Sequence, residues 1–117
     1  MQRLPITLSL MMLLLPAAAD AGDYAPIECS KAHGPAEKAI CSSYALGQAE
    51  ARVATLFGIA TSLVAMGQRG DINDAQRKWI ETRDACGANE PCLASAYDER
   101  IRALNGVIQG IAARGPY

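Results

Sequence analysis

The chain has 117 residues, half of them hydrophobic, and its 11 basic and 12 acidic side chains give a net charge of −1. This length fits one domain with a modest core and excludes a multidomain assembly. No polybasic stretch occurs and charges of both signs are interspersed, so neither nucleic acid nor an anionic membrane surface is an expected partner. The balance is compatible with a protein partner, including a strongly cationic one.

The first residues have the layout of a secretory signal peptide. A positive charge at Arg3 precedes an apolar run over residues 4–15, and a proline and small residues follow. The run is shorter than the about 20 apolar residues that span a bilayer. Cleavage is predicted after Ala19, with Ala21 as an alternative. No cysteine follows either cut, so we expect a periplasmic or secreted product without a membrane anchor.

The chain after the leader divides into an irregular segment and a helical domain. Residues 20–35 are rich in glycine, proline and isolated charges. This composition predicts an irregular N-terminal segment that is attached to the rest of the domain through Cys29. Over residues 36–64 apolar side chains recur at steps of three and four, which is typical of one face of a long amphipathic helix. Gly67 and Gly70 are expected to end this helix.

Two further helices are predicted. Asp71 has the side chain of a helix N-cap, and the apolar stripe after it predicts a second helix that reaches Cys86. Gly87 and Pro91 favour a turn, after which a third helix begins near Pro91. No strand-like alternation occurs. The expected fold is therefore all-α, a small three-helix arrangement with an αα-hairpin over residues 36–114.

The cysteines favour disulfides. Four cysteines in a short exported chain predict two bridges. Cys86 and Cys92 would lie about 9 Å apart along one straight helix, too far for a bridge, so a turn must separate them. We expect Cys86–Cys92 and Cys29–Cys41, and the two crossed pairings stay open. Each short loop closed in this way would stabilise the domain by about 2–3 kcal/mol.

The residue types that carry catalysis do not form a recognisable group. His33 is the single histidine and has no second histidine at ligand spacing, so no metal and no cofactor are expected. The carboxylates stand at helical spacing from basic residues, which is typical of solvated helix faces. These pairs are Asp74 with Lys78, Arg77 with Glu81, and Asp98 with Arg102. The chain is accordingly not expected to be an enzyme and has no candidate catalytic residue.

Four large side chains on the apolar stripes are expected to form a structural framework. Arg83 and Arg100 fall where a guanidinium is costly unless it meets carboxylates or backbone carbonyls. Such arginines usually tie helices together, and binding to a partner is the alternative. Trp79 and Tyr97 stand at helical spacing and are expected in the core, where either would become a binding anchor if it proved exposed.

The spacing of these residues resembles a known family. Three parts of the sequence carry the resemblance: Cys29 with Ala39-Ile40-Cys41, then Gln76-Arg77-x-Trp79-x-x-x-Arg83-Asp84-x-Cys86, then Cys92-Leu93-x-x-x-Tyr97-x-x-Arg100-Ile101-x-x-Leu104. This series is similar to that of the LprI-type lysozyme inhibitors of bacterial envelopes. The resemblance covers residues 29–104. It implies a helical, disulfide-bonded secreted domain, and inhibition of host lysozyme by some members. The chain departs from lipid-anchored members by lacking a cysteine at the cleavage site.

Two functions follow as hypotheses. The first is a binding protein that inhibits lysozyme by occluding its active-site cleft, through the predicted loops at residues 67–73 and 87–91. Glu90 and Asp71 are the candidate partner contacts, and a rigid loop lowers the entropy cost of binding. The alternative is an envelope interaction or structural module with no lysozyme activity. An exposed apolar patch on the final helix would favour it, at Val107, Ile108 and Ile111. The oligomeric state stays open.

Overall fold

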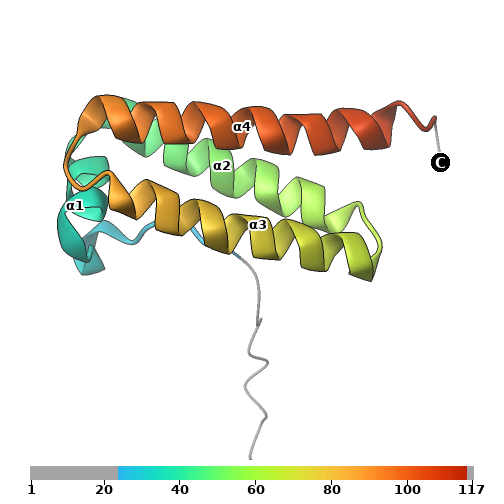
Figure 1. Ribbon diagram of the computed structural model, residues 1–117, viewed down its shortest axis with the longest axis horizontal. Helices are drawn as coiled ribbons and strands as arrows, with labels where there is room; N and C mark the ends of the chain where they lie inside the picture. The colour runs from blue at the N-terminus through green and yellow to red at the C-terminus, as the bar shows by residue number, and fades with distance from the viewer. Residues whose placement is uncertain (1–23, 116–117) are drawn as a thin grey trace, which may run out of the picture.

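A computed structural model describes residues 24–115, and over this range the chain forms one 3-10 turn and four α-helices, without strands. The elements are η1 (Cys29–Lys31), α1 (Gly34–Ser42), α2 (Tyr44–Ser62), α3 (Met66–Ala85) and α4 (Glu90–Ala112) (Figure 1). The all-α prediction with an αα-hairpin is confirmed. The predicted signal peptide lies outside the described residues. None of the described helices is long and apolar enough to cross a membrane.

The three long helices lie lengthwise side by side, and α1 covers one end of them (Figure 1). α2 and α4 run in the same direction and share the most extensive contact, while α3 runs opposite to both. α1 contacts all three near the start of α2, the end of α3 and the start of α4. We call this the α1 end of the bundle, and the opposite end, around residues 63–66, the α2–α3 end.

The predicted single helix over residues 36–64 is wrong, because the chain breaks at Ser43. Ser43 is extended, with φ −112° and ψ 121°, and its hydroxyl accepts a hydrogen bond from the backbone N–H of Leu46 at 3.3 Å. A serine in this position caps a new helix, since its side chain replaces a missing backbone partner. The cap turns α2 away from α1, so α1 can cover the end of the bundle.

The predicted start of the second helix at Asp71 is also wrong. α3 begins five residues earlier in the sequence, at Met66, so Gly67, Gly70 and Asp71 all lie within the helix. Residues 67–73 therefore do not form the loop that we expected. The turn that joins α2 to α3 is shorter and occupies residues 63–65.

Tertiary contacts explain why α3 extends through its two glycines. The backbone N–H of Arg69 bonds to the Ala65 carbonyl at 2.9 Å, and its Nε donates to the Thr61 carbonyl at 2.8 Å. The second bond fastens the first turn of α3 to the last turn of α2. Each glycine costs about 1 kcal/mol relative to alanine in a helix, and packing against a neighbour routinely outweighs this preference.

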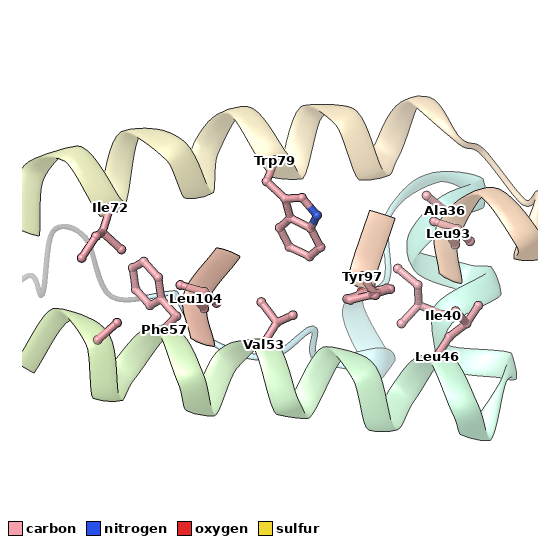
Figure 2. Close-up of a cluster of buried hydrophobic side chains, with 11 residues drawn as sticks. Ala36, Ile40, Leu46, Val53, Phe57, Ile72, Trp79, Leu93, Tyr97 and Leu104 are labelled. Atoms are coloured by element: carbon pink, nitrogen blue, oxygen red, sulfur yellow. The ribbon is translucent and has the colours of Figure 1, made fainter. Parts of the chain in front are cut away.

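The core lies between the long helices and extends to α1 (Figure 2). Trp79 and Tyr97 are both buried, with ring centroids 5.2 Å apart in an edge arrangement, and Trp79 Nε1 donates to the Ala96 carbonyl at 2.9 Å. The other large core side chains are Ile40, Leu46, Val53, Phe57, Ile72, Leu93 and Leu104. Each helix contributes an apolar stripe, so the core needs all four helices.

The final helix does not carry an exposed apolar patch at the expected residues. Val107 and Ile108 are half-buried and pack against the core, and Ile111 is buried. The apolar periodicity of the last helix is therefore used for folding. Exposed large hydrophobic side chains lie instead at the α2–α3 end, where Leu63 is 56 % and Met66 85 % exposed, and at the start of α2, where Tyr44 is 85 % exposed.

Both expected disulfides are present. Cys29–Cys41 joins the N-terminal segment to the last turn of α1, and Cys86–Cys92 closes the turn between α3 and α4. The Cα atoms are 5.6 Å apart in each bridge, the usual separation for a disulfide. The crossed pairings are excluded. Both bridges lie at the α1 end of the bundle.

Candidate functional site

The turn between α3 and α4 is an exposed segment whose backbone is constrained in three ways. Gly87 has φ +58°, a left-handed conformation that glycine adopts without strain. Asn89 then caps α4, its Oδ1 accepting from the Cys92 N–H at 2.9 Å. The Cys86–Cys92 bridge closes the same turn. Glu90 follows as the first residue of α4 and is exposed, so a rigid turn presents a carboxylate to solvent.

The α1 end of the bundle holds several carboxylates around one buried cation. Arg83 is 2 % exposed, and its guanidinium lies 2.9 Å from Asp84, 3.4 Å from Glu50 and 3.8 Å from Glu37. The charge of Arg83 is therefore used inside the protein. Asp84, whose side chain is 46 % exposed, faces solvent beside it, and Glu90 is exposed at the start of α4. This end exposes Asp84 and Glu90 and also Lys31 on η1 and Lys38 on α1, while Arg83 is hidden.

Glu50 is the central buried carboxylate, and we did not single it out from the sequence. It is 3 % exposed and accepts hydrogen bonds from the hydroxyls of Tyr24 and Tyr97, in addition to its pairing with Arg83. A signal was available. Glu50 stands four residues after Leu46 and three before Val53, on the apolar stripe, where a carboxylate requires buried partners.

Tyr24 fastens the N-terminal segment to the bundle. Its ring meets Phe57 and Trp79 edge-on, with centroids 6.0 and 6.4 Å apart, and its hydroxyl also accepts from Arg83 Nη1 at 3.2 Å. Burial, followed by the charge of Glu50, raises the pKa of Tyr24 far above its usual value. The phenol therefore stays neutral and keeps donating to Glu50.

Two further groups of this network have shifted pKa values. Burial and the hydrogen bond to Glu50 raise the pKa of Tyr97 in the same way. Burial alone would lower the pKa of Arg83, but Tyr24, Asp84 and the other neighbours outweigh it and raise that pKa. The two phenols and the guanidinium thus keep their protons over the physiological range, which suits a structural role.

Arg100 is held differently. Its Nε donates to Gln76 Oε1 at 2.7 Å and its Nη2 to the Ile72 carbonyl at 3.4 Å, which ties α4 to α3. Both acceptors are neutral. Burial lowers the pKa of Arg100. Arg83 and Arg100 therefore both join helices, but only Arg83 does so through carboxylates.

The two candidate contacts are not brought together. Asp71 is exposed in the second turn of α3, near the α2–α3 end, whereas Glu90 follows the other end of that helix. The 14 residues from Asp71 to the end of α3 at Ala85 span about 21 Å of helix axis. One small contact surface therefore does not include both carboxylates.

The remaining polar residues have local roles. Arg77 pairs with Asp74 rather than with the expected Glu81. His33 is exposed, and its backbone N–H donates to Glu37 Oε2 at 2.6 Å at the start of α1. Within residues 24–115 no group of three or more His, Cys, Asp and Glu side chains is placed to hold a metal ion.

A second surface feature lies at the α2–α3 end. Ile59 is 41 % exposed and, with Leu63 and Met66, forms an apolar patch around the turn between these helices. We call these three residues the apolar corner. Exposed apolar side chains that lie together are one indication of contact with another molecule.

A comparison with known families places the chain. The family model of the lysozyme inhibitor LprI matches residues 29–113, which covers α1 to α4 and both disulfides. Searches of curated proteins and of solved structures gave no match. The match spans most of the chain and includes the arginine, tryptophan and tyrosine framework described above. The chain therefore belongs to the LprI lysozyme inhibitor family.

Proposed function

We propose that this protein is an exported, non-enzymatic binding protein that inhibits a lysozyme by occluding its active-site cleft. Membership of the LprI family supports this function. The observation that carries the proposal is the turn between α3 and α4, closed by Cys86–Cys92 and presenting Glu90. Its backbone is fixed by the bridge, by the Asn89 cap and by the left-handed Gly87, and residues 88–91 of the turn are exposed.

The turn has the physical properties that an inhibitor needs. A closed, capped turn loses little conformational entropy on binding, so more of its contact energy appears as affinity. Glu90 on the turn and Asp84 just before it expose carboxylates, while the exposed cations of this end, Lys31 and Lys38, lie on η1 and α1 instead. A cationic lysozyme would be attracted to such a surface. Glu90 would then meet basic side chains of the enzyme while the turn fills the cleft.

Asp71 is the other candidate contact from the sequence, and we do not include it in the proposed contact surface. Its helix places it near the opposite end of the bundle, beside the apolar corner. A protein that fills a cleft with one end uses only one of these carboxylates. Substituting Glu90 and Asp71 separately therefore shows which end of the bundle contacts the lysozyme.

The experiment is a titration of residual lysozyme activity on cell-wall substrate. Animal-type and goose-type enzymes are mixed with the oxidised mature protein, with a reduced and alkylated sample, and with Glu90→Ala and Asp71→Ala. We expect inhibition that saturates near one to one and disappears on reduction. Glu90→Ala should weaken it about 5- to 30-fold, as a central contact does, and Asp71→Ala should leave it unchanged. No inhibition at micromolar excess would overturn the proposal.

A second candidate function is an envelope interaction module without lysozyme activity, and the apolar corner favours it. Met66 at 85 % exposure has no evident role in the fold. If the corner mediates self-association, the purified protein should elute as a dimer or larger species in size exclusion with light scattering. Leu63→Gln with Met66→Gln should then restore the monomer. A strict monomer at high concentration argues against self-association through this corner.

A further inference from the structure

Arg100 is a buried cation without an ionic partner. It is 8 % exposed, and its two hydrogen bonds go to a side-chain amide and a backbone carbonyl. Among the ion pairs of residues 24–115, Arg83 meets carboxylates and Arg100 meets none. Burying a charge without a counterion is expensive, so an arginine in this state calls for an explanation.

The hydrogen-bonding capacity of this guanidinium is also incompletely used. A guanidinium has five N–H donors in a fixed planar fork, and the two bonds that hold Arg100 engage Nε and Nη2. Nη1 forms no hydrogen bond to another described residue. A carboxylate matches the geometry of the fork and would supply the missing negative charge.

Arg100 opens onto a groove between α3 and α4. The groove has a volume of about 270 Å³. Its lining combines the largely buried Trp79 with small side chains, and Lys78 adds a second cation, whereas Glu99 contributes an opposing charge. The full lining is Ala75, Lys78, Trp79, Thr82, Glu99, Arg100 and Ala103. A buried cation, an apolar wall and an opening to solvent are thus found in one place.

We propose that this groove binds a small molecule that carries one carboxylate on an apolar, ring-sized body, with Arg100 as the counterion. The volume is below the about 300–1,000 Å³ of sites for drug-sized ligands, so the ligand is small. Trp79 and the alanines cover its apolar body, and Lys78 attracts it from solution. The carboxylate completes the charge balance that the fold leaves unfilled at Arg100.

Glu99 sets the limit on what the groove accepts. Its carboxylate lines the same groove, so it repels a ligand that bears a second negative charge near the first. The hydroxyl of Thr82 donates to the Lys78 carbonyl at 3.2 Å and is already engaged, as is the Trp79 N–H, which bonds to Ala96. Recognition therefore depends on the two cations and the apolar wall.

Phenylacetate is a suitable probe, and phenylacetamide is its neutral control. Each is titrated into the oxidised mature protein and followed by two-dimensional NMR at the Arg100 Nε–H and the Trp79 indole N–H. Trp79 is the single tryptophan of the chain, so its signal is unambiguous. We expect both signals to shift to saturation with phenylacetate, more weakly in high salt, and to stay unchanged with phenylacetamide. Non-saturating shifts, or equal shifts with both compounds, would overturn the proposal.

Three exposed positions give variants that should fold. Glu99→Gln removes the repulsion and should tighten phenylacetate binding about two- to fivefold, while Lys78→Gln should weaken it by a similar factor. Asp98→Asn is the matched control, because Asp98 is also exposed on α4 but does not line this groove. The Asp98→Asn protein should bind phenylacetate with the same affinity as the unsubstituted protein. Unchanged affinity in both Glu99→Gln and Lys78→Gln would contradict the assignment.

Arg100→Gln tests the counterion itself. It should abolish the saturable shift of the Trp79 signal while the rest of the NMR spectrum keeps its dispersion. Arg100 also joins α3 to α4, so this variant is informative only if its NMR spectrum shows a folded protein. If it does not fold, the Glu99→Gln and Lys78→Gln variants decide the proposal. Retained binding in a folded Arg100→Gln protein would overturn it.

Discussion

The two ends of the bundle are stabilised in different ways. The α1 end holds both disulfides and the buried group of Glu50, Arg83, Tyr24 and Tyr97. In the described part of the chain, the α2–α3 end has neither, and a hydrogen bond from Arg69 and apolar contacts hold it. Covalent and ionic constraints thus gather where the rigid turn with Glu90 lies. A small domain has only a limited core, so it can be rigid at one end without being rigid throughout.

The largest expected effect is the loss of Arg83. Arg83→Met leaves Glu50 buried without its cation, and breaking a buried ion pair on one side costs about 3–5 kcal/mol. Arg69→Met at the other end removes one bond to a backbone carbonyl and should cost about 1 kcal/mol. Urea unfolding of the oxidised proteins measures both free energies. Equal costs for the two variants would contradict the difference between the ends.

The next effect is that of the bridge beside Glu90. Cys86→Ser with Cys92→Ser opens a loop with a sequence separation of 6, and loop entropy predicts a loss of about 2–3 kcal/mol in the free energy of unfolding. Inhibition of lysozyme should weaken further than this loss of folded protein explains, because the turn becomes mobile. The matched variant is Cys29→Ser with Cys41→Ser, which should lower stability by a similar amount while the folded fraction keeps its affinity.

High pH should destabilise the α1 end. Because the pKa values of Tyr24 and Tyr97 are raised in the folded protein, the unfolded chain loses these protons first as the pH passes 10. Stability is therefore complete below about pH 10 and falls above it, by up to about 1.4 kcal/mol per pH unit for each phenol. Urea unfolding between pH 9 and 11 measures the slope. Tyr97→Phe should halve it, and a flat profile would contradict the network.

The smallest effect is expected at the apolar corner. Met66→Gln replaces a side chain that is 85 % exposed, so the free energy of unfolding should change by less than about 0.5 kcal/mol. Thermal unfolding of the Met66→Gln variant beside the unsubstituted protein measures this change. A loss above 1 kcal/mol would show that the corner supports the fold instead of being free for contact.

Much of the fold could be predicted because its signals are local. Apolar stripes at helical spacing indicated the helices, and Gly87 with Pro91 indicated the turn that the Cys86–Cys92 bridge requires. The break at Ser43 was missed because the apolar pattern continues across it. The start of α3 was missed because Arg69 overrides two glycines through a contact with α2, which local preference does not reveal.

The candidate site was predictable only in part. Glu90 could be placed on a constrained turn, since the cysteine spacing indicates that turn. The partnership of Tyr24, Glu50 and Tyr97 joins positions far apart in the chain, and no sequence pattern indicates which buried residues meet. The arginines show the same limit. Both were expected to need partners, but only the structure distinguishes Arg83, with its carboxylates, from Arg100, without them.

Amide hydrogen exchange on the protein mixed with one equivalent of lysozyme tests the central claim most directly. If the α3–α4 turn enters the cleft, slowed exchange should be concentrated at residues 84–92, and residues 59–71 around the apolar corner should exchange as in the free protein. Protection centred on residues 59–71, or no change anywhere, would contradict the account.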